Sequence, residues 1–542
     1  MKKIALLPLL LAAYGLQAQT VDEAENLIYH ARYDGAAQMA QNVIENDPQN
    51  AEAYYWQTAA YLQQDKDEAV EQSLIAAPAS VKSAPLYQVA YGHLLLDRGQ
   101  PDSAAYFFNA ALDATREKDA FVLSSIAKAH IEAEKGNATY ALELLDKAIK
   151  RDKREPALYT LKGDAYMKLQ NGSEAFKAYK EALDKDKGHA AALYKLGNLF
   201  ASQKNPDLYL QYYNDAIQAD PAFAPAYYAL YYHYYFTDVA KAMDYYKQYL
   251  QHTDKNLQTE YAYTDLLYLN KQYNEAIKNA NTLLNKAGNE AEPRLYKLIA
   301  YSYRDQQDSA KAFDYMSTYF AKAPDSAHVV KDYETMAELY LSQGGSQDSA
   351  ARYFEKALAL VTDSTAKYDY YKKLAKMYGG MQNNAAEADW LGLYYTGNED
   401  ATNVDLFNWA LAHYKAGEFE AADSVFGLYT EKYPDQTFGF YWRARSNMAR
   451  ENAMEEGYAI PHYQKLIEMA EGDLTNETNK KWLIEAYGYL AAYQTNTHKN
   501  YAEAITLFEK LLTLDPQNED AQKYISILKK NLSDTSTTKA GK

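Results

Sequence analysis

The chain of 542 residues contains no cysteine. This absence excludes disulfide bonds, thiol nucleophiles, cysteine-ligated metals and a lipid anchor on an N-terminal cysteine. In an oxidising compartment such a chain has to be stabilised by packing alone.

Catalytic motifs and long apolar runs are also missing. HExxH, GxxxxGK, GxSxG and GxGxxG do not occur, and 73 acidic residues single out no acid/base pair. Asp184, Asp186 and Gly188 lack the remaining ligands of a calcium loop. His93 and His130 occupy matching repeat positions and leave a two-histidine metal site as the weaker alternative to surface histidines. The sequence therefore predicts no enzyme, no catalytic residue, no cofactor and no resident metal.

Basic residues are outnumbered, with 56 Lys and Arg against 73 Asp and Glu and a net charge of −17. Phosphate backbones and anionic lipid surfaces repel such a chain. After the first segment no stretch reaches the roughly 18 apolar residues of a membrane span. We expect neither a nucleic-acid partner nor direct insertion into a membrane.

The first 18 residues have the pattern of a cleavable signal peptide. Lys2 and Lys3 precede an apolar run from Ile4 to Ala13, and Leu16-Gln17-Ala18 forms an imperfect small-residue cleavage site. A membrane anchor is the alternative, but the run is too short to span a bilayer of roughly 30 Å. The sequence predicts a signal peptide over 1–18 and a periplasmic protein that is not a lipoprotein.

One pattern recurs along the chain: a small residue, a bulky one four positions later and an apolar one three beyond it. This spacing places all three on one helix face. Clear copies start at Ala104, Ala141, Ala175, Ala276, Ala312, Ala350, Ala422 and Ala504, and weaker ones at Ala36, Ala69, Tyr209, Ala242, Ala386 and Ala459. The period of 33 to 38 residues, with a last step of 45, predicts a helical repeat.

A second helix precedes most of these copies, with a small residue about twelve positions before the anchor, as at Gly92, Gly163, Gly197 and Ala300. A small side chain there lets two helices approach closely. Prolines end several copies: Pro48, Pro221, Pro324, Pro434 and Pro516.

The segment EPALYTLKGDAYMKLQNGSEAFKAYKEALDKDKGH, with Tyr159, Gly163, Tyr166, Ala175, Tyr179 and Ala182, resembles a tetratricopeptide repeat (TPR). The resemblance extends over nearly all of residues 22–532. It implies an all-α, right-handed superhelical solenoid of about 14 helix-turn-helix repeats over 19–518. A capping helix over 519–532, with Ala521, Tyr524, Ile525, Leu528 and Leu532 on its apolar face, and a disordered tail over 533–542 complete the prediction.

Three segments depart from the pattern. Tyr231 occupies a position that usually holds a small residue, residues 445–458 carry an insertion, and Gly379 to Asn403 is either a hinge or a loosely matching repeat.

Tyrosine is abundant, with 55 residues. In the family that the chain resembles, some first-helix positions line a concave groove. That register predicts the following ligand- or peptide-binding residues: Tyr194, Asn198, Tyr228, Tyr232, Tyr235, Phe236, Arg294, Lys297, Tyr301, Arg304, Tyr441 and Arg445. Aromatic rings offer large contact areas at low entropic cost, but a stripe at helical spacing can equally be core, and the basic cluster a solvated face.

These observations favour a non-catalytic scaffold or adaptor that binds a protein or peptide. The C-terminal repeats resemble exported TPR proteins of the Gram-negative envelope, which implies partners such as envelope transport or outer-membrane assembly components. The alternative is a periplasmic protein that binds a glycan or cell-wall fragment through its groove tyrosines.

Overall fold

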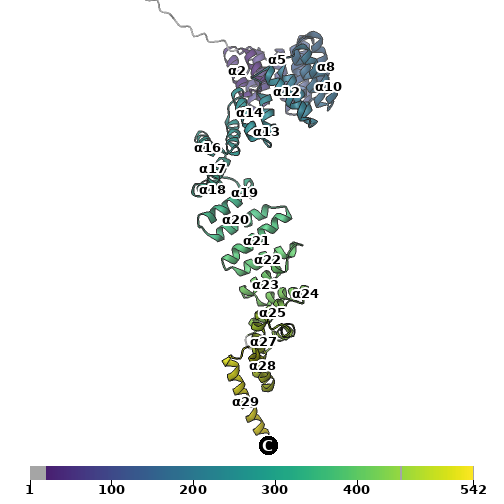
Figure 1. Cartoon of the computed structure of the whole chain (residues 1–542). Helices are drawn as coiled ribbons and strands as arrows, with labels where there is room; N and C mark the ends of the chain where they lie inside the picture. Colours follow the sequence, from purple (N-terminus) through teal and green to yellow (C-terminus); the bar gives the residue numbers. More distant parts are fainter. Residues whose placement is uncertain (1–19, 452–453, 541–542) are drawn as a thin grey trace, which may run out of the picture. The chain divides into compact units, whose positions relative to one another are not determined.

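The computed structural model describes residues 20–451 and 454–540, with side chains up to Ser533. The predicted signal peptide lies outside these residues. The described chain is helical throughout and contains no strand (Figure 1). Its α-helices fall into two compact units, one up to Leu298 and one from Ile299, so that the division lies within α17.

The helices of unit 1 are short and closely spaced. They are α1 (Val21–Tyr29), α2 (Tyr33–Asn46), α3 (Ala51–Leu62), α4 (Asp67–Ala76), α5 (Pro85–Asp97), α6 (Pro101–Thr115), α7 (Ala120–Glu132), α8 (Ala138–Arg151), α9 (Pro156–Lys168), α10 (Gly172–Lys185), α11 (Ala190–Ser202), α12 (Pro206–Ala219), α13 (Ala224–Tyr234), α14 (Val239–His252), α15 (Leu257–Leu269) and α16 (Tyr273–Ala287). A 3-10 turn, η1 (Gly288–Glu290), follows.

Unit 2 continues in the same way. Its helices are the end of α17 (Arg294–Asp305), α18 (Ser309–Lys322), α19 (Val330–Ser342), α20 (Gln347–Leu360), α21 (Ser364–Gly380), α22 (Asn384–Gly397), α23 (Asn403–Ala416), α24 (Phe419–Lys432), α25 (Thr437–Arg450), α26 (Ile460–Ala470), α27 (Glu477–Asn496), α28 (Tyr501–Leu514) and α29 (Glu519–Ala540), with η2 (Asp325–Ala327) after α18.

Local sequence sets where these helices begin and end. The side chains of Asn137, Asn171 and Asn205 accept backbone N–H groups at the starts of α8, α10 and α12, as N-cap residues do. The helices that precede the five predicted stop prolines end at Asn46, Ala219, Lys322, Lys432 and Leu514, two residues before each proline. The predicted stops are therefore confirmed.

Each odd-numbered helix up to α27 is followed by a second helix, and most of these pairs pack closely. The repeat anchor is the fourth residue of that second helix and is at most 1% exposed at Ala36, Ala104, Ala141, Ala175, Ala242, Ala276, Ala312, Ala350, Ala422 and Ala504. The described chain is thus the all-α array of helix pairs that the periodicity predicts.

Glycine in the first helix is needed where a ring from the second helix lies flat against it. A Cβ on Gly163 would lie 2.2 Å from Cε1 of Tyr179, and one on Gly197 would lie 2.4 Å from Cε1 of Tyr213. In α13 Tyr231 takes this position, and its ring centroid lies 4.7 Å from that of Tyr246. It lies eleven residues before Ala242 because α13 is two residues shorter than α9 while the turn after it is one residue longer.

Three of the weaker anchors are shifted. In α4 the buried residue is Val70 and not Ala69, and in α22 it is Ala388 and not Ala386. Ala459 precedes α26, whose fourth residue, Tyr463, is fully buried. The buried position therefore lies one to four residues after the predicted anchor in these repeats.

The last helix is longer than predicted. Ala521, Ile525 and Leu528 are buried against α28, and the ring of Tyr524 stacks on Phe508, as a capping helix requires, although Leu532 is exposed. The backbone stays helical to Ala540, beyond the predicted end of the capping helix at residue 532. This segment holds neither proline nor glycine before Gly541, and nothing in it stops the helix. Residues 541–542 lie outside the described chain.

The irregular segment from Gly379 to Asn403 is repeat-like. It contains the end of α21 and all of α22, as expected for a loosely matching repeat.

Among the described residues, no helix combines the length and apolar character needed to cross a membrane.

Candidate binding cavity

Unit 1 contains a half-open cavity of about 570 Å³, here called the N-terminal cavity. Its wall comes mainly from the first helices α1, α3, α7, α9 and α11. The fifth and ninth residues of these helices recur in the lining: Glu25 and Tyr29 of α1, Tyr55 of α3, Ser124 and Lys128 of α7, and Thr160 and Asp164 of α9. A side chain every fourth residue faces the same way, so one helix face forms the lining.

Contacts between distant segments close the helices of unit 1 into a turn around this cavity. The His30 ring nitrogen Nε2 lies 2.8 Å from Oδ2 of Asp220, and Gly35 N–H donates to Asp254 at 3.1 Å. The backbone N–H of Ala191 donates to the Tyr29 hydroxyl at 3.2 Å. These contacts join residues 29–35 to residues 191–254, so the inner face of the array borders a half-open cavity.

One side of the N-terminal cavity is aromatic. The ring centroids of Tyr55 and Phe121 lie 5.5 Å apart, and the Trp56 ring lies 4.8 Å from Tyr55 and 5.6 Å from Phe121. Such edge-to-face clusters fix ring orientation. We call these three residues the aromatic wall.

Two ion pairs form the charged part of the lining. Lys128 Nζ lies 3.9 Å from Glu132, and Lys195 Nζ lies 3.0 Å from Asp164. Asp164 also accepts a hydrogen bond of 2.7 Å from the hydroxyl of Tyr179, which fixes the carboxylate. A second recess of about 440 Å³ shares these four charged residues.

Burial shapes the charge states of these groups. Burial is the largest influence on Lys128 and disfavours its charged form, but the summed attraction of Glu132, Tyr55, Tyr33 and Glu25 raises the pKa of Lys128. Burial also raises the pKa of Glu132, against the attraction of Lys128. For Lys195 the attraction and the hydrogen bond of Asp164, together with the attraction of Tyr194 and Glu132, raise the pKa against burial. Both lysines therefore stay charged and paired near neutral pH.

The sequence-predicted residues of α11 lie beside this cavity and not in its lining. The ring of Tyr194 packs on Tyr213 and Phe223 at 5.8 and 5.7 Å. Asn198 Oδ1 accepts a hydrogen bond of 2.8 Å from the Tyr213 hydroxyl. Both side chains pack within the array, the alternative that the sequence left open.

The predicted aromatics of α13 are mostly exposed. Tyr228, Tyr232 and Phe236 are 46%, 63% and 79% exposed, and we call them the α13 aromatic patch. Tyr235 is half-buried, with its ring centroid 4.9 Å from Phe236. The patch is accessible, and its role in binding stays a prediction.

The basic residues of the predicted cluster do not act together, because each contacts neighbouring side chains of its own. Arg294 pairs with Asp265 at 3.3 Å and with Glu292 at 2.9 Å, and Lys297 is half-buried in the same helix. In unit 2, Arg304 donates to Thr335 at 2.9 Å.

Tyr301 of unit 2 donates to Asp332, which is fully buried. Arg304 lies over the Tyr301 ring at 4.7 Å. These contacts anchor α17 to α19 and do not assemble an anion site.

Tyr441 and Arg445 of α25 contact one another. Tyr441 is 6% exposed, stacks on Trp482 at 4.3 Å and donates to Glu485 at 3.0 Å. Arg445 donates to the Tyr441 hydroxyl at 3.2 Å. The ring of Tyr441 belongs to the core of unit 2, the alternative that the sequence left open, and its role in binding stays a prediction.

The residues of the N-terminal cavity were missed, although the sequence held the signal. Tyr194 and Asn198 are the fifth and ninth residues of α11, as Tyr228 and Tyr232 are of α13. The same two positions in the earlier first helices give the lining residues named above. The predicted groove residues begin in α11, so the matching positions of the earlier first helices are absent from the prediction.

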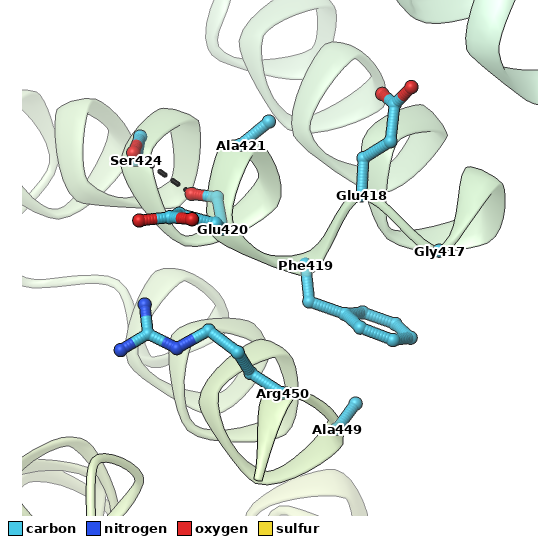
Figure 2. A pocket seen from close by; sticks show the side chains of 8 residues that line it. All are labelled: Gly417, Glu418, Phe419, Glu420, Ala421, Ser424, Ala449 and Arg450. Atoms are coloured by element: carbon cyan, nitrogen blue, oxygen red, sulfur yellow. Dashed lines mark hydrogen bonds between the residues drawn. The ribbon is translucent and has the colours of Figure 1, made fainter.

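Unit 2 contains a larger but open recess of about 670 Å³ beside Gly417 (Figure 2). The side chains of Glu418 and Glu420 point in different directions, and Arg450 lies on a facing helix (Figure 2). The hydrogen bond from Ser424 to the Glu420 carbonyl belongs to the helix itself. No set of polar groups converges there, so the recess lacks the features of a binding site. In the described chain no group of three or more His, Cys, Asp or Glu is placed to hold a metal ion.

The geometry defines a class: an array of helix pairs whose first helices line an inner surface. Models of the tetratricopeptide repeat match residues 21–85, 126–188, 160–222 and 406–435. These matches support membership of the tetratricopeptide-repeat family.

Solved structures of repeat proteins are similar over parts of the chain. The C-terminal part of a TPR repeat-containing protein from Cytophaga hutchinsonii is 27% identical and covers 49% of this chain and 98% of its own, with a TM-score of 0.29. A tetratricopeptide repeat protein from Parabacteroides merdae is 19% identical over 48% of this chain and 98% of its own, with a TM-score of 0.29. No curated protein matches the chain. Because these TM-scores are low, the fold assignment rests on the helix pairs and the family models.

Proposed function

We propose that this chain is a non-catalytic scaffold whose N-terminal cavity takes an extended peptide segment of a partner protein. The observation that carries the proposal is the lining of aromatic rings and fixed charged pairs. A volume of about 570 Å³ suits a short stretch of peptide and is far too small for a folded surface. The α13 aromatic patch offers a second contact area for the same partner.

The location is part of the proposal. The scaffold would act in the periplasm and serve an envelope assembly or transport complex. Support comes from the pattern of residues 1–18 and from the absence of cysteine. Intact-mass analysis of the protein from its native host should give a chain that begins at or near Gln19, and a soluble chain that keeps Met1 would contradict export.

A glycan or cell-wall fragment is the second candidate ligand. The aromatic wall favours it, because flat apolar faces beside carboxylates and amides suit a ring with polar edges. Unlike the first candidate ligand, a glycan has no peptide backbone.

Peptide and glycan arrays, both probed with the same labelled chain, separate the two candidates. Ala157→Trp should block the mouth of the N-terminal cavity, since Ala157 lines it and is exposed. Ala105→Trp is the matched control, because Ala105 is exposed on the second helix α6. Peptide binding that is lost with the first variant and kept with the second supports the proposal. Binding to glycans alone would replace it with the second candidate, and peptide binding unaffected by Ala157→Trp would contradict a role for the cavity.

A further inference from the structure

The charge balance of the N-terminal cavity is acidic. Its lining contains the acids Glu25, Glu132, Asp152, Glu155 and Asp164 but only the two lysines Lys128 and Lys195. Each lysine already has a carboxylate partner, Glu132 or Asp164. An anionic ligand would have to displace these partners, so it is disfavoured.

Two of the remaining acids line the cavity and form no ion pair there, although the charge of Lys128 attracts that of Glu25. No ion pair joins Glu25 or Glu155 to a lysine or arginine in the part of the chain that the structure describes. Asp152 also forms no ion pair among the described residues, and its Oδ1 accepts the backbone N–H of Arg154 at 3.0 Å in the turn before α9. Glu155 Oε1 accepts the N–H of Ala157, which fixes it at the start of α9.

Glu25 on α1 and Glu155 at the start of α9 are far apart in the sequence, but both line the N-terminal cavity. The pKa of Glu25 is raised by burial, and next by repulsion from Glu52, Asp22 and Glu155, against a smaller attraction from Lys128. Carboxylates that repel one another at a cavity form a site that a cation stabilises.

The aromatic wall stands beside these carboxylates and suits the same charge. Lys128 Nζ lies 5.8 Å from the centroid of the Trp56 ring, so this wall already holds one ammonium group near a ring. Aromatic faces attract ammonium and guanidinium groups, most strongly where water is partly excluded. Rings and carboxylates together select an organic cation over a neutral or anionic group.

We propose that the N-terminal cavity takes a lysine or arginine side chain of an extended peptide, between the aromatic wall and the carboxylates of Glu25 and Glu155. This inference rests on the proposed peptide-binding function and names the chemistry that the site selects. The apolar stem of the basic side chain would lie along Tyr55 and Phe121, and its charged end would reach the two carboxylates.

Trp56 provides the readout, since the other tryptophans, at positions 390, 409, 442 and 482, belong to unit 2. The probes are the acetylated and amidated peptides Gly-Lys-Gly-Lys-Gly, Gly-Gln-Gly-Gln-Gly and Gly-Glu-Gly-Glu-Gly. They are titrated into the full chain by calorimetry and by tryptophan fluorescence, with Trp56→Phe to assign the optical change. We expect the lysine peptide to bind at least tenfold more tightly than the glutamine peptide, and the glutamate peptide to bind most weakly.

The double variant Glu25→Gln/Glu155→Gln should lose at least tenfold in affinity for the lysine peptide and leave the glutamine peptide unchanged. Glutamine keeps the acceptor that caps α9, so the fold should be preserved. The matched control, Glu68→Gln/Glu181→Gln, removes two exposed carboxylates from the second helices α4 and α10 and should change neither affinity.

The outcomes separate this inference from the function on which it rests. Equal binding of all three peptides, with a change at Trp56, would overturn the preference for a basic side chain and leave peptide binding intact. Preference for the glutamate peptide would overturn it as well. If no peptide binds and a glycan does, both proposals fail.

Discussion

The first helices of the two units are buried in different ways, although both units repeat the same helix pair. In α3 of unit 1 every residue from Ala53 to Ala60 is buried. In α23 of unit 2 only Leu406, Ala410 and Ala412 are buried. A helix buried all round contacts neighbours on several sides, whereas one buried along a stripe packs on a single side.

The difference follows from which helices touch. In unit 1 first helices pack on one another, α1 on α3, α3 on α5, α5 on α7 and α7 on α9. In the described part of unit 2 the substantial packing runs between consecutive helices, as α20 to α28 follow one another in Figure 1. Small residues such as Ala59, Ala90 and Ala127 line the contacts of unit 1, whereas Trp409 and Trp442 fill those of unit 2. The two units therefore differ in whether first helices contact one another, and in unit 1 these contacts accompany the cavity.

Overpacking a first helix of unit 1 should have the largest effect. In Gly163→Leu the new side chain would meet the Tyr179 ring, which is held by its hydrogen bond to Asp164. We expect unit 1 to lose about 3 kcal/mol. Gly380→Leu in unit 2 is the control, because no atom lies within 4 Å of the added Cβ. Hydrogen exchange of peptides from each unit measures both effects, and equal losses would contradict the packing account.

A low pH should lower the free energy of unfolding of unit 1, because buried histidines then become protonated on unfolding. Burial lowers the pKa of His93 to about 3 and that of His130 to about 4, below the ordinary value of 6.5. A depressed pKa contributes stability that is complete above pH 6.5 and is lost as the pH falls toward the folded-state pKa. Between pH 6.5 and 4, the free energy of unfolding falls as the pH is lowered. In the His93→Gln variant this fall should be smaller than in the unchanged chain by about 1.4 kcal/mol per pH unit. Urea unfolding at several pH values measures the slope, and an unchanged slope would show that His93 is not buried as a neutral ring.

Opening the closed turn should cost less. Asp254→Ala removes the acceptor of Gly35 N–H, a loss of about 1 kcal/mol for unit 1. Exchange should increase at residues 33–46 and stay unchanged in unit 2. The exposed pair of Lys66 and Asp34 is the control, and Asp34→Ala should change stability by less than about 0.5 kcal/mol. Equal effects of the two variants would mean that Asp254 does not hold the turn closed.

The smallest effect on stability is expected at the α13 aromatic patch. Tyr232→Ser/Phe236→Ser should shift unfolding by less than about 0.5 kcal/mol, since both rings are exposed. Tyr246→Ala, which truncates a ring that is 1% exposed, should cost about 3 kcal/mol or more. If the double variant also loses peptide binding, the patch contributes to recognition, whereas a collapse of melting would place it in the core.

Local features of the sequence predicted much of the fold and little of the site. Anchors such as Ala104 and Ala175 and the stop at Pro221 act within one repeat, so periodicity finds them. The contact of His30 with Asp220 joins residues 190 positions apart and depends on small rotations summed over several repeats. No local pattern encodes that sum. The cavity could therefore be predicted as a set of helix positions, but its closure could not.

A disulfide tests the closed turn most directly, because the chain has no cysteine of its own. A Cβ on Gly35 would lie 3.0 Å from Oδ1 of Asp254, so the side chains of cysteines at these two positions would face each other across the closed turn. Under mild oxidation Gly35→Cys/Asp254→Cys should form an intramolecular bond, seen as a faster band on a non-reducing gel that a thiol reverses. Gly35→Cys/Asp244→Cys, with its second cysteine at an exposed position of α14, should not. If the first pair stays reduced while both of its thiols react with maleimide, unit 1 is an open array and the account of its cavity is wrong.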